Sequence, residues 1–98
     1  MRQILIFKQD GCPPCKHILP FCNKIGSYYQ TSPKVPNQNK IVTSIVDIHD
    51  PKYMALTASY GVNSTPTVLG LVNNQLVGRI TGANEEKIED LYYKTSTL

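Results

Sequence analysis

A pair of cysteines at the junction of a strand pattern and a helix pattern limits the folds open to this chain. Residues 3–7, Gln-Ile-Leu-Ile-Phe, form an apolar run that indicates a buried strand. The pattern then becomes helical, because apolar residues between Ile18 and Ile25 recur at three- and four-residue spacings. This predicts a helix from Pro13 to about residue 28. The segment Cys12-Pro13-Pro14-Cys15 therefore lies where a strand gives way to the first turn of a helix.

Strand and helix patterns continue to alternate along the rest of the chain. The predicted elements are strands at 40–48, 67–72 and 75–81, a helix from Pro51 to about Tyr60, and a last helix after Asn84. Asn73-Asn74 indicates a tight hairpin between the last two strands, because Asn tolerates positive φ. The order β-α-β-α-β-β-α predicts an α/β fold. We expect a four-stranded mixed sheet, with a parallel first β-α-β unit, an antiparallel closing hairpin and helices on both faces.

Prolines mark the beginning of the first helix and one point inside it. Pro13 and Pro14 suit a first turn, where a missing N–H group costs nothing. Pro20 falls inside the helix, and we expect it to kink the axis there.

The size and charge of the chain exclude several classes of protein. Its 98 residues are enough for one domain, spanning 1–98. No apolar run approaches the roughly 18 residues of a membrane-spanning helix. The net charge of +3 comes from scattered Lys and Arg residues without a basic block, so nothing favours a nucleic-acid partner. We expect a soluble, monomeric protein of the cytoplasm.

The cysteine spacing indicates redox chemistry. Three cysteines are too few, and odd in number, for a secreted disulfide framework. Cys12 precedes a helix, whose free N–H groups favour a thiolate, and Lys16 can add to that effect. Cys15 lies one turn further on the same face, so the two sulfurs can close a ring. The predicted mechanism is attack by Cys12 on a substrate disulfide, followed by resolution of the mixed disulfide by Cys15.

A zinc site is the alternative from a different functional class. Cys12, Cys15, His17 and Cys22 are four potential ligands within eleven residues. Three of them would have to turn inward from one helix, and their spacing lacks the usual separation between ligand pairs. We therefore favour redox chemistry and expect no bound metal.

Three segments resemble the thioredoxin family. Residues 12–20, Cys-Pro-Pro-Cys-Lys-His-Ile-Leu-Pro, resemble the active-site run with its later helix proline. Residues 60–67, Tyr-Gly-Val-Asn-Ser-Thr-Pro-Thr, are similar to the stretch that ends in a cis-proline, and Gly82-Ala83 matches the pair before the last helix. The resemblance implies a thioredoxin-like fold and disulfide reductase activity. It also implies a cis Thr65–Pro66 bond facing the cysteines, with the redox-active disulfide as the only cofactor.

The resemblance also suggests partners and a substrate surface. We expect disulfide-containing proteins to bind over a surface that includes Pro13, Pro14, Thr65, Pro66 and Gly82. A thioredoxin reductase would recharge the cysteine pair. A glutaredoxin-type reductase that uses glutathione is the alternative, because glutaredoxins prefer the similar motif Cys-Pro-Tyr-Cys.

Three positions depart from the thioredoxin pattern, and one of them is Pro13, which stands where thioredoxins usually have Gly. Gly11 stands where thioredoxins usually have Trp, and Ile6 stands where they have a buried Asp that takes part in proton transfer. Asp47 is the nearest candidate to replace that acid.

The remaining chemically capable residues are expected to be structural. Cys22 should pack in the core, since free Cys is often buried. His17 should lie on the surface, and His49, which precedes a helix, should have a structural role. The pairs Tyr28-Tyr29 and Tyr92-Tyr93 should pack at the edge of the core.

Overall fold

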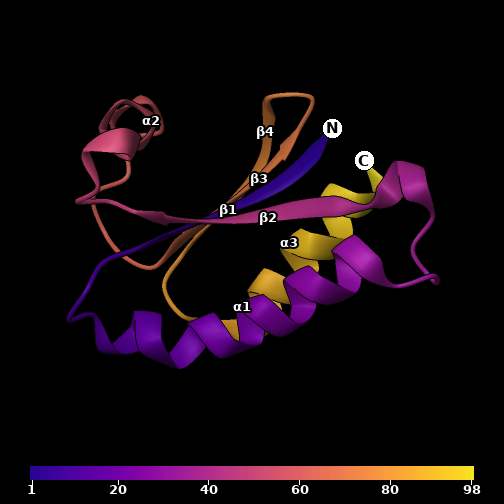
Figure 1. The fold of residues 1–98 in the computed structure, drawn as a ribbon, viewed down its shortest axis with the longest axis horizontal. Coiled ribbons are helices and arrows are strands. Elements are labelled where there is room, and N and C mark those ends of the chain that lie inside the picture. Colours follow the sequence, from indigo (N-terminus) through magenta and orange to yellow (C-terminus); the bar gives the residue numbers. More distant parts are fainter.

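The computed structural model describes all 98 residues and shows one sheet with helices on both sides (Figure 1). The strands are β1 (Arg2–Lys8), β2 (Ile41–Asp47), β3 (Thr67–Val72) and β4 (Gln75–Thr81). The helices are α1 (Pro13–Thr31), α2 (Met54–Ser59) and α3 (Glu85–Thr97). Short 3₁₀ turns occupy Asn37–Asn39 and Pro51–Tyr53.

The sheet has the order β2-β1-β3-β4, and it is mixed as the sequence predicts. β1 pairs in parallel with β2 from Arg2 opposite Ile41 to Lys8 opposite Asp47. β1 and β3 are antiparallel, and so are β3 and β4. Asn73 and Asn74 both have positive φ in the predicted hairpin.

The central strand β1 is buried on both faces. Its side chains alternate, so Ile4 and Ile6 pack with one cluster while Leu5 and Phe7 pack with the other. This explains why the strand reads as a continuous apolar run rather than an alternating one.

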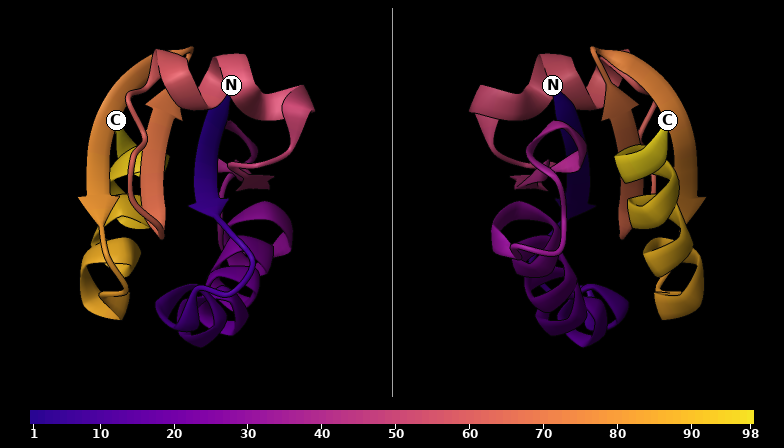
Figure 2. Two further views of the ribbon diagram at one scale, coloured as in Figure 1. Left: turned by 90° about the vertical axis from the view of Figure 1, so that its left-hand side faces the viewer. Right: turned by 90° about the vertical axis from the view of Figure 1, so that its right-hand side faces the viewer.

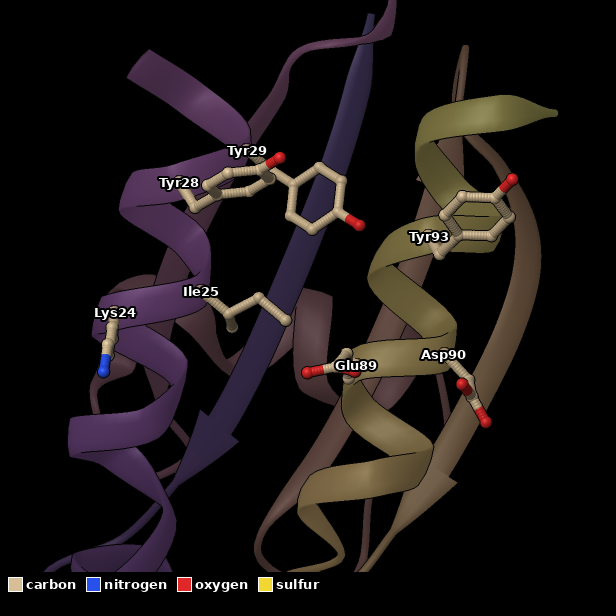
Figure 3. Close-up of a pocket in the computed structure, with 7 residues that line it drawn as sticks. All are labelled: Lys24, Ile25, Tyr28, Tyr29, Glu89, Asp90 and Tyr93. Atoms are coloured by element: carbon tan, nitrogen blue, oxygen red, sulfur yellow. The ribbon is translucent and has the colours of Figure 1, made fainter. Parts of the chain in front are cut away.

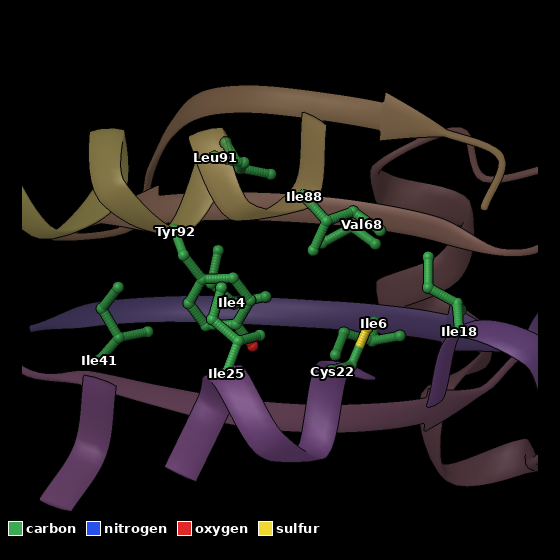
Figure 4. Packing of buried hydrophobic residues seen from close by; sticks show 10 residues of the cluster. All are labelled: Ile4, Ile6, Ile18, Cys22, Ile25, Ile41, Val68, Ile88, Leu91 and Tyr92. Carbon is green, nitrogen blue, oxygen red and sulfur yellow. The ribbon is translucent and has the colours of Figure 1, made fainter. Parts of the chain in front are cut away.

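Two helical layers cover the sheet (Figure 2). Helices α1 and α3 lie side by side on one face, where Ile18, Cys22, Ile88 and Tyr92 pack onto the strands (Figure 4). The other face is covered by α2 and the segments on either side of it, with Leu56 among the side chains packed there. None of the helices has the length and apolar content needed to cross a membrane.

Two elements differ from the sequence prediction. α1 extends to Thr31, three residues further than the pattern indicates, although it does contain Pro20 in its interior, as predicted. The single helix expected from Pro51 to about Tyr60 is instead a 3₁₀ turn followed by the six-residue α2. The Asp50 side chain accepts a hydrogen bond from the Lys52 N–H and caps the 3₁₀ turn instead of an α-helix.

Candidate active site

Cys12 is the N-cap residue of α1. Gly11, at φ 75°, turns the chain out of the loop after β1. Cys12 itself is extended, with φ −102° and ψ 101°. Its sulfur accepts a hydrogen bond from the Cys15 N–H at 3.2 Å. One of the free N–H groups of the helix start is therefore directed at this sulfur, as the sequence predicts.

Cys12 and Cys15 form a disulfide with a Cα–Cα distance of 5.2 Å. Its place at a helix start, just after a strand, would leave Cys12 open to solvent, yet only 7% of the residue is exposed. The cause is Thr65, whose hydroxyl and carbonyl oxygens lie 3.5 and 3.7 Å from the Cys12 sulfur. Cys15 is even less accessible, with 1% exposed. Of the two sulfur-bearing residues, Cys12 is the one nearer to solvent.

The Thr65–Pro66 bond is cis, as the resemblance implies, and it lies against the cysteines. The Gly82 N–H donates a hydrogen bond to the Pro66 carbonyl at 2.9 Å. Gly82 has φ 100°, a conformation that a side chain would strain. The loop before α3 is thereby attached to the cis segment. Pro13 and Pro14 are exposed on the first turn of α1.

Sequence reasoning missed Gln9 and did not connect His49 with the site. Gln9 donates from Nε2 to the Thr65 hydroxyl oxygen at 2.9 Å. The His49 Nε2 lies 2.9 Å from Gln9 Oε1. Gln9 follows β1 and His49 follows β2, so the parallel pairing of these strands brings the two residues together. Their 40-position separation leaves no signal in any local pattern.

No carboxyl group replaces the buried acid. Ile6 is fully buried, and the buried polar residues are only Thr67, Thr95 and Ser96. Asp47 is bound elsewhere: one oxygen accepts from the His49 N–H at 2.9 Å, and the other lies 3.4 Å from Lys8 Nζ. The His49 hydrogen bond and the Lys8 ammonium hold the Asp47 pKa below its ordinary value against a smaller desolvation effect.

Cys22 is a core residue, as expected. It is fully buried in the cluster between α1, α3 and the sheet (Figure 4). Burial raises the pKa of the Cys22 thiol to about 11, with a further contribution from the charge of Glu85. It is therefore a poor nucleophile at neutral pH.

The four potential zinc ligands do not come together. His17 is exposed, as expected, and its Nε2 lies 3.6 Å from a carboxylate oxygen of Glu85, whereas Cys22 is in the core. The structure contains no group of three or more His, Cys, Asp or Glu side chains that could hold a metal ion.

The sequence predicts that the tyrosines pack at the edge of the core, but a groove lies between α1 and α3 where some of them are exposed (Figure 3). Tyr92 is fully buried, and Tyr29 stacks on it with 5.4 Å between ring centroids. Tyr28 and Tyr93 are instead 46% and 65% exposed, so they do not pack as predicted. The groove encloses about 670 Å³ and is lined by Lys24, Ile25, Tyr28, Tyr29, Glu89, Asp90 and Tyr93. It includes neither cysteine of the disulfide.

The fold and the site define a class of protein. A disulfide closes the first turn of a helix that follows the central strand, and a cis-proline segment lies against it. Thiol–disulfide exchange is the chemistry that such a pair performs. This chain is a thiol–disulfide oxidoreductase with a thioredoxin-like fold.

Comparison with known proteins establishes the family. The thioredoxin family model matches residues 2–94. Thioredoxin of Oryctolagus cuniculus is 33% identical over 88% of this chain and 71% of the relative. Thioredoxin-1 of Drosophila yakuba is 30% identical over 93% of this chain and 76% of the relative. The chain belongs to the thioredoxin family.

Solved thioredoxin structures have the same fold. The germline-specific thioredoxin Deadhead of Drosophila melanogaster superposes with a TM-score of 0.78 at 27% identity, covering 95% of this chain and 79% of the other. The reduced thioredoxin pre-protein of Schistosoma mansoni gives the same TM-score at 23% identity, covering 96% and 78%.

Proposed function

We propose that this chain reduces disulfides in other proteins, with Cys12 as the attacking sulfur and Cys15 as the resolving sulfur. The observation that carries the assignment is the difference between the two cysteines. Cys12 is the more exposed and receives the Cys15 N–H hydrogen bond at the helix start, whereas Cys15 is almost completely enclosed. A sulfur at a helix N-terminus is the better thiolate.

The proposed reaction transfers two electrons in two exchanges. The Cys12 thiolate attacks one sulfur of the substrate disulfide, whose S–S bond breaks, and the departing sulfur takes up a proton. The Cys15 thiolate then attacks Cys12 in the mixed disulfide and releases the second substrate thiol. The substrate is reduced to a dithiol and the chain is left with the Cys12–Cys15 disulfide.

The substrate surface that we propose surrounds this pair. Half-buried Thr65 lies beside Cys12, and the buried Pro66 connects it to Gly82, whereas exposed Pro13 and Pro14 lie on the first turn of α1. Because the Pro66 carbonyl is already bonded to the Gly82 N–H, the backbone of Thr65 is the part of the cis segment that would bind an extended stretch of substrate chain.

Trapping of the mixed disulfide distinguishes the attacking sulfur from the resolving sulfur. Cys15→Ser should accumulate a mixed disulfide with an insulin substrate, and Cys12→Ser should form none. Nonreducing electrophoresis with mass spectrometry of the adduct measures both. Capture by Cys12→Ser and not by Cys15→Ser would reverse the assignment.

A second assay identifies the electron donor. We propose a thioredoxin reductase, because the family match is to thioredoxins. Insulin reduction should be supported by NADPH with thioredoxin reductase and not by glutathione with its reductase. The opposite result would favour glutaredoxin-type use.

We further propose that the chain acts as a monomer in the cytoplasm, where thiols are kept reduced. Some relatives are mitochondrial thioredoxins, from Schizosaccharomyces pombe and Bos taurus. Cell fractionation distinguishes the two compartments, and light scattering measures the mass of the purified chain.

A further inference from the structure

Three side chains connect the surface to the Cys12 sulfur. The His49 Nε2 lies 2.9 Å from Gln9 Oε1. Gln9 Nε2 lies 2.9 Å from the Thr65 hydroxyl oxygen, which lies 3.5 Å from the Cys12 sulfur. The only other polar groups at that sulfur are the Cys15 N–H and the Thr65 carbonyl.

A thiolate at Cys12 fixes the direction of every hydrogen bond in the series from His49 through Gln9 and Thr65. A thiolate only accepts hydrogen bonds, so the Thr65 hydroxyl must donate to it. The hydroxyl oxygen must then accept from the Gln9 amide N–H. Gln9 consequently presents its carbonyl oxygen outward, and His49 must donate to that oxygen from Nε2.

We propose that Gln9 and His49 are positioning residues that hold the Thr65 hydroxyl as a hydrogen-bond donor to the Cys12 thiolate. This inference rests on the proposed function in taking Cys12 as the attacking sulfur. Three donors aligned in one direction polarise one another, so the last bond is stronger than an isolated one would be. Without Gln9, the hydroxyl is free to rotate away from the sulfur.

Charged residues hold His49, the surface end of this hydrogen-bonded series, in place. The His49 backbone N–H is held by Asp47, and Asp47 also pairs with Lys8. Lys8 Nζ lies 3.2 Å from Asp10 as well. The positive Lys8 is therefore balanced by two carboxylates at the ends of the paired strands β1 and β2.

The test is a thiolate titration of reduced, full-length protein in a Cys15→Ser background, followed by ultraviolet absorbance. Thr65→Val should lower the ionisation constant of Cys12 by about tenfold, because a hydrogen bond to the charged sulfur is lost. Gln9→Met should lower it by roughly threefold and His49→Leu by roughly twofold, because these residues act through Thr65.

Conservative variants provide the matched controls. Thr65→Ser keeps the hydroxyl, and His49→Gln keeps a donor at the position of Nε2, so both should titrate like the parent protein. Nitrogen NMR of the parent should also show the His49 proton on Nε2 when the ring is neutral. Unchanged ionisation in Gln9→Met and His49→Leu, or a neutral ring protonated on Nδ1, would overturn the proposal.

The titration needs no substrate and no reductase, so its result is independent of turnover. If Cys15→Ser fails to capture substrate while Gln9→Met and His49→Leu still shift the Cys12 ionisation, the proposed function is wrong and the positioning role of the two residues stands. If capture succeeds and neither substitution shifts the ionisation, only the positioning role is wrong.

Discussion

Ile6 is the residue at which this chain departs most from the chemistry expected of its family. The resemblance places a buried acid there, beneath the disulfide, yet Ile6 is fully buried among apolar side chains that include Ile18 and Cys22. A negative charge near a thiol raises the thiol pKa, so its absence favours the Cys12 thiolate. The same absence removes a base that could deprotonate Cys15, and we expect resolution by Cys15 to become faster as the pH rises.

Installing the acid tests this account. Ile6→Asp should raise the Cys12 pKa, and it should destabilise the fold by about 3 kcal/mol or more because a polar group replaces a packed one without a partner. Thiolate absorbance and urea unfolding measure the two effects. Ile6→Asn is the matched control, since it has the same shape without the charge. It should lose similar stability and leave the Cys12 pKa near that of the parent. Equal pKa values in the Asp and Asn variants would contradict the electrostatic explanation.

At the scale of elements, α1 carries the reactive pair on its first turn and approaches β2 closely further along. The close approach is at Gly26, where an added Cβ would lie 2.8 Å from Thr43 Oγ1 and 3.2 Å from the Tyr92 hydroxyl. Those two oxygens form a 2.7 Å hydrogen bond between β2 and α3. Gly26 is thus a point at which α1, α3 and the sheet all meet closely.

Gly26→Ala tests whether this contact or helix propensity dominates. Ala favours a helix over Gly by about 1 kcal/mol, but the methyl group must displace Thr43 or Tyr92. We expect a net loss of about 1–2 kcal/mol in the free energy of unfolding, because overpacking outweighs the propensity gain. Urea unfolding compares it with Ser27→Ala, an exposed neighbour on the same helix, which should be neutral or slightly stabilising. A more stable Gly26→Ala protein would show that β2 moves aside freely.

At the scale of the whole molecule, Arg2 joins segments from distant parts of the chain. Its Nε donates to the Gln38 carbonyl at 2.8 Å. Its Nη1 donates to the carbonyls of Thr95 and Leu98 at 2.8 and 2.9 Å. The beginning of β1, the 3₁₀ turn before β2 and the last turn of α3 are therefore held together at the end of the molecule opposite the cysteines.

Arg2→Met keeps most of the aliphatic stem and removes all three hydrogen bonds. We expect a loss of about 1–3 kcal/mol in stability, since only the bond to the Thr95 carbonyl is partly buried and water can reach the other two carbonyls. Amide hydrogen exchange in the last turn of α3 should accelerate, whereas exchange near Cys12 should not change. Lys34→Met removes one exposed positive charge and should alter neither quantity. Equal effects of the two substitutions would mean that net charge, and not the Arg2 contacts, is responsible.

The sequence by itself determined the order of the strands and main helices and the reactive pair, because both depend on neighbours along the chain. The 67–72 and 75–81 strands lie where their pattern predicts, and Cys12 and Cys15 share a helix face through their three-residue spacing. The cis Thr65–Pro66 bond could be predicted only from the resemblance to thioredoxins, since the local sequence pattern does not distinguish a cis from a trans bond.

Only the tertiary structure decided which groups surround the Cys12 sulfur. Thr65 lies 53 positions from Cys12 and covers it, which is why Cys12 is less exposed than its place at a helix start indicates. Gln9 and His49 meet because β1 and β2 pair in parallel and end at the same edge. The groove beside Tyr93 has the same origin, because its lining comes from two helices that lie far apart in the sequence. No local period records which distant segments come together.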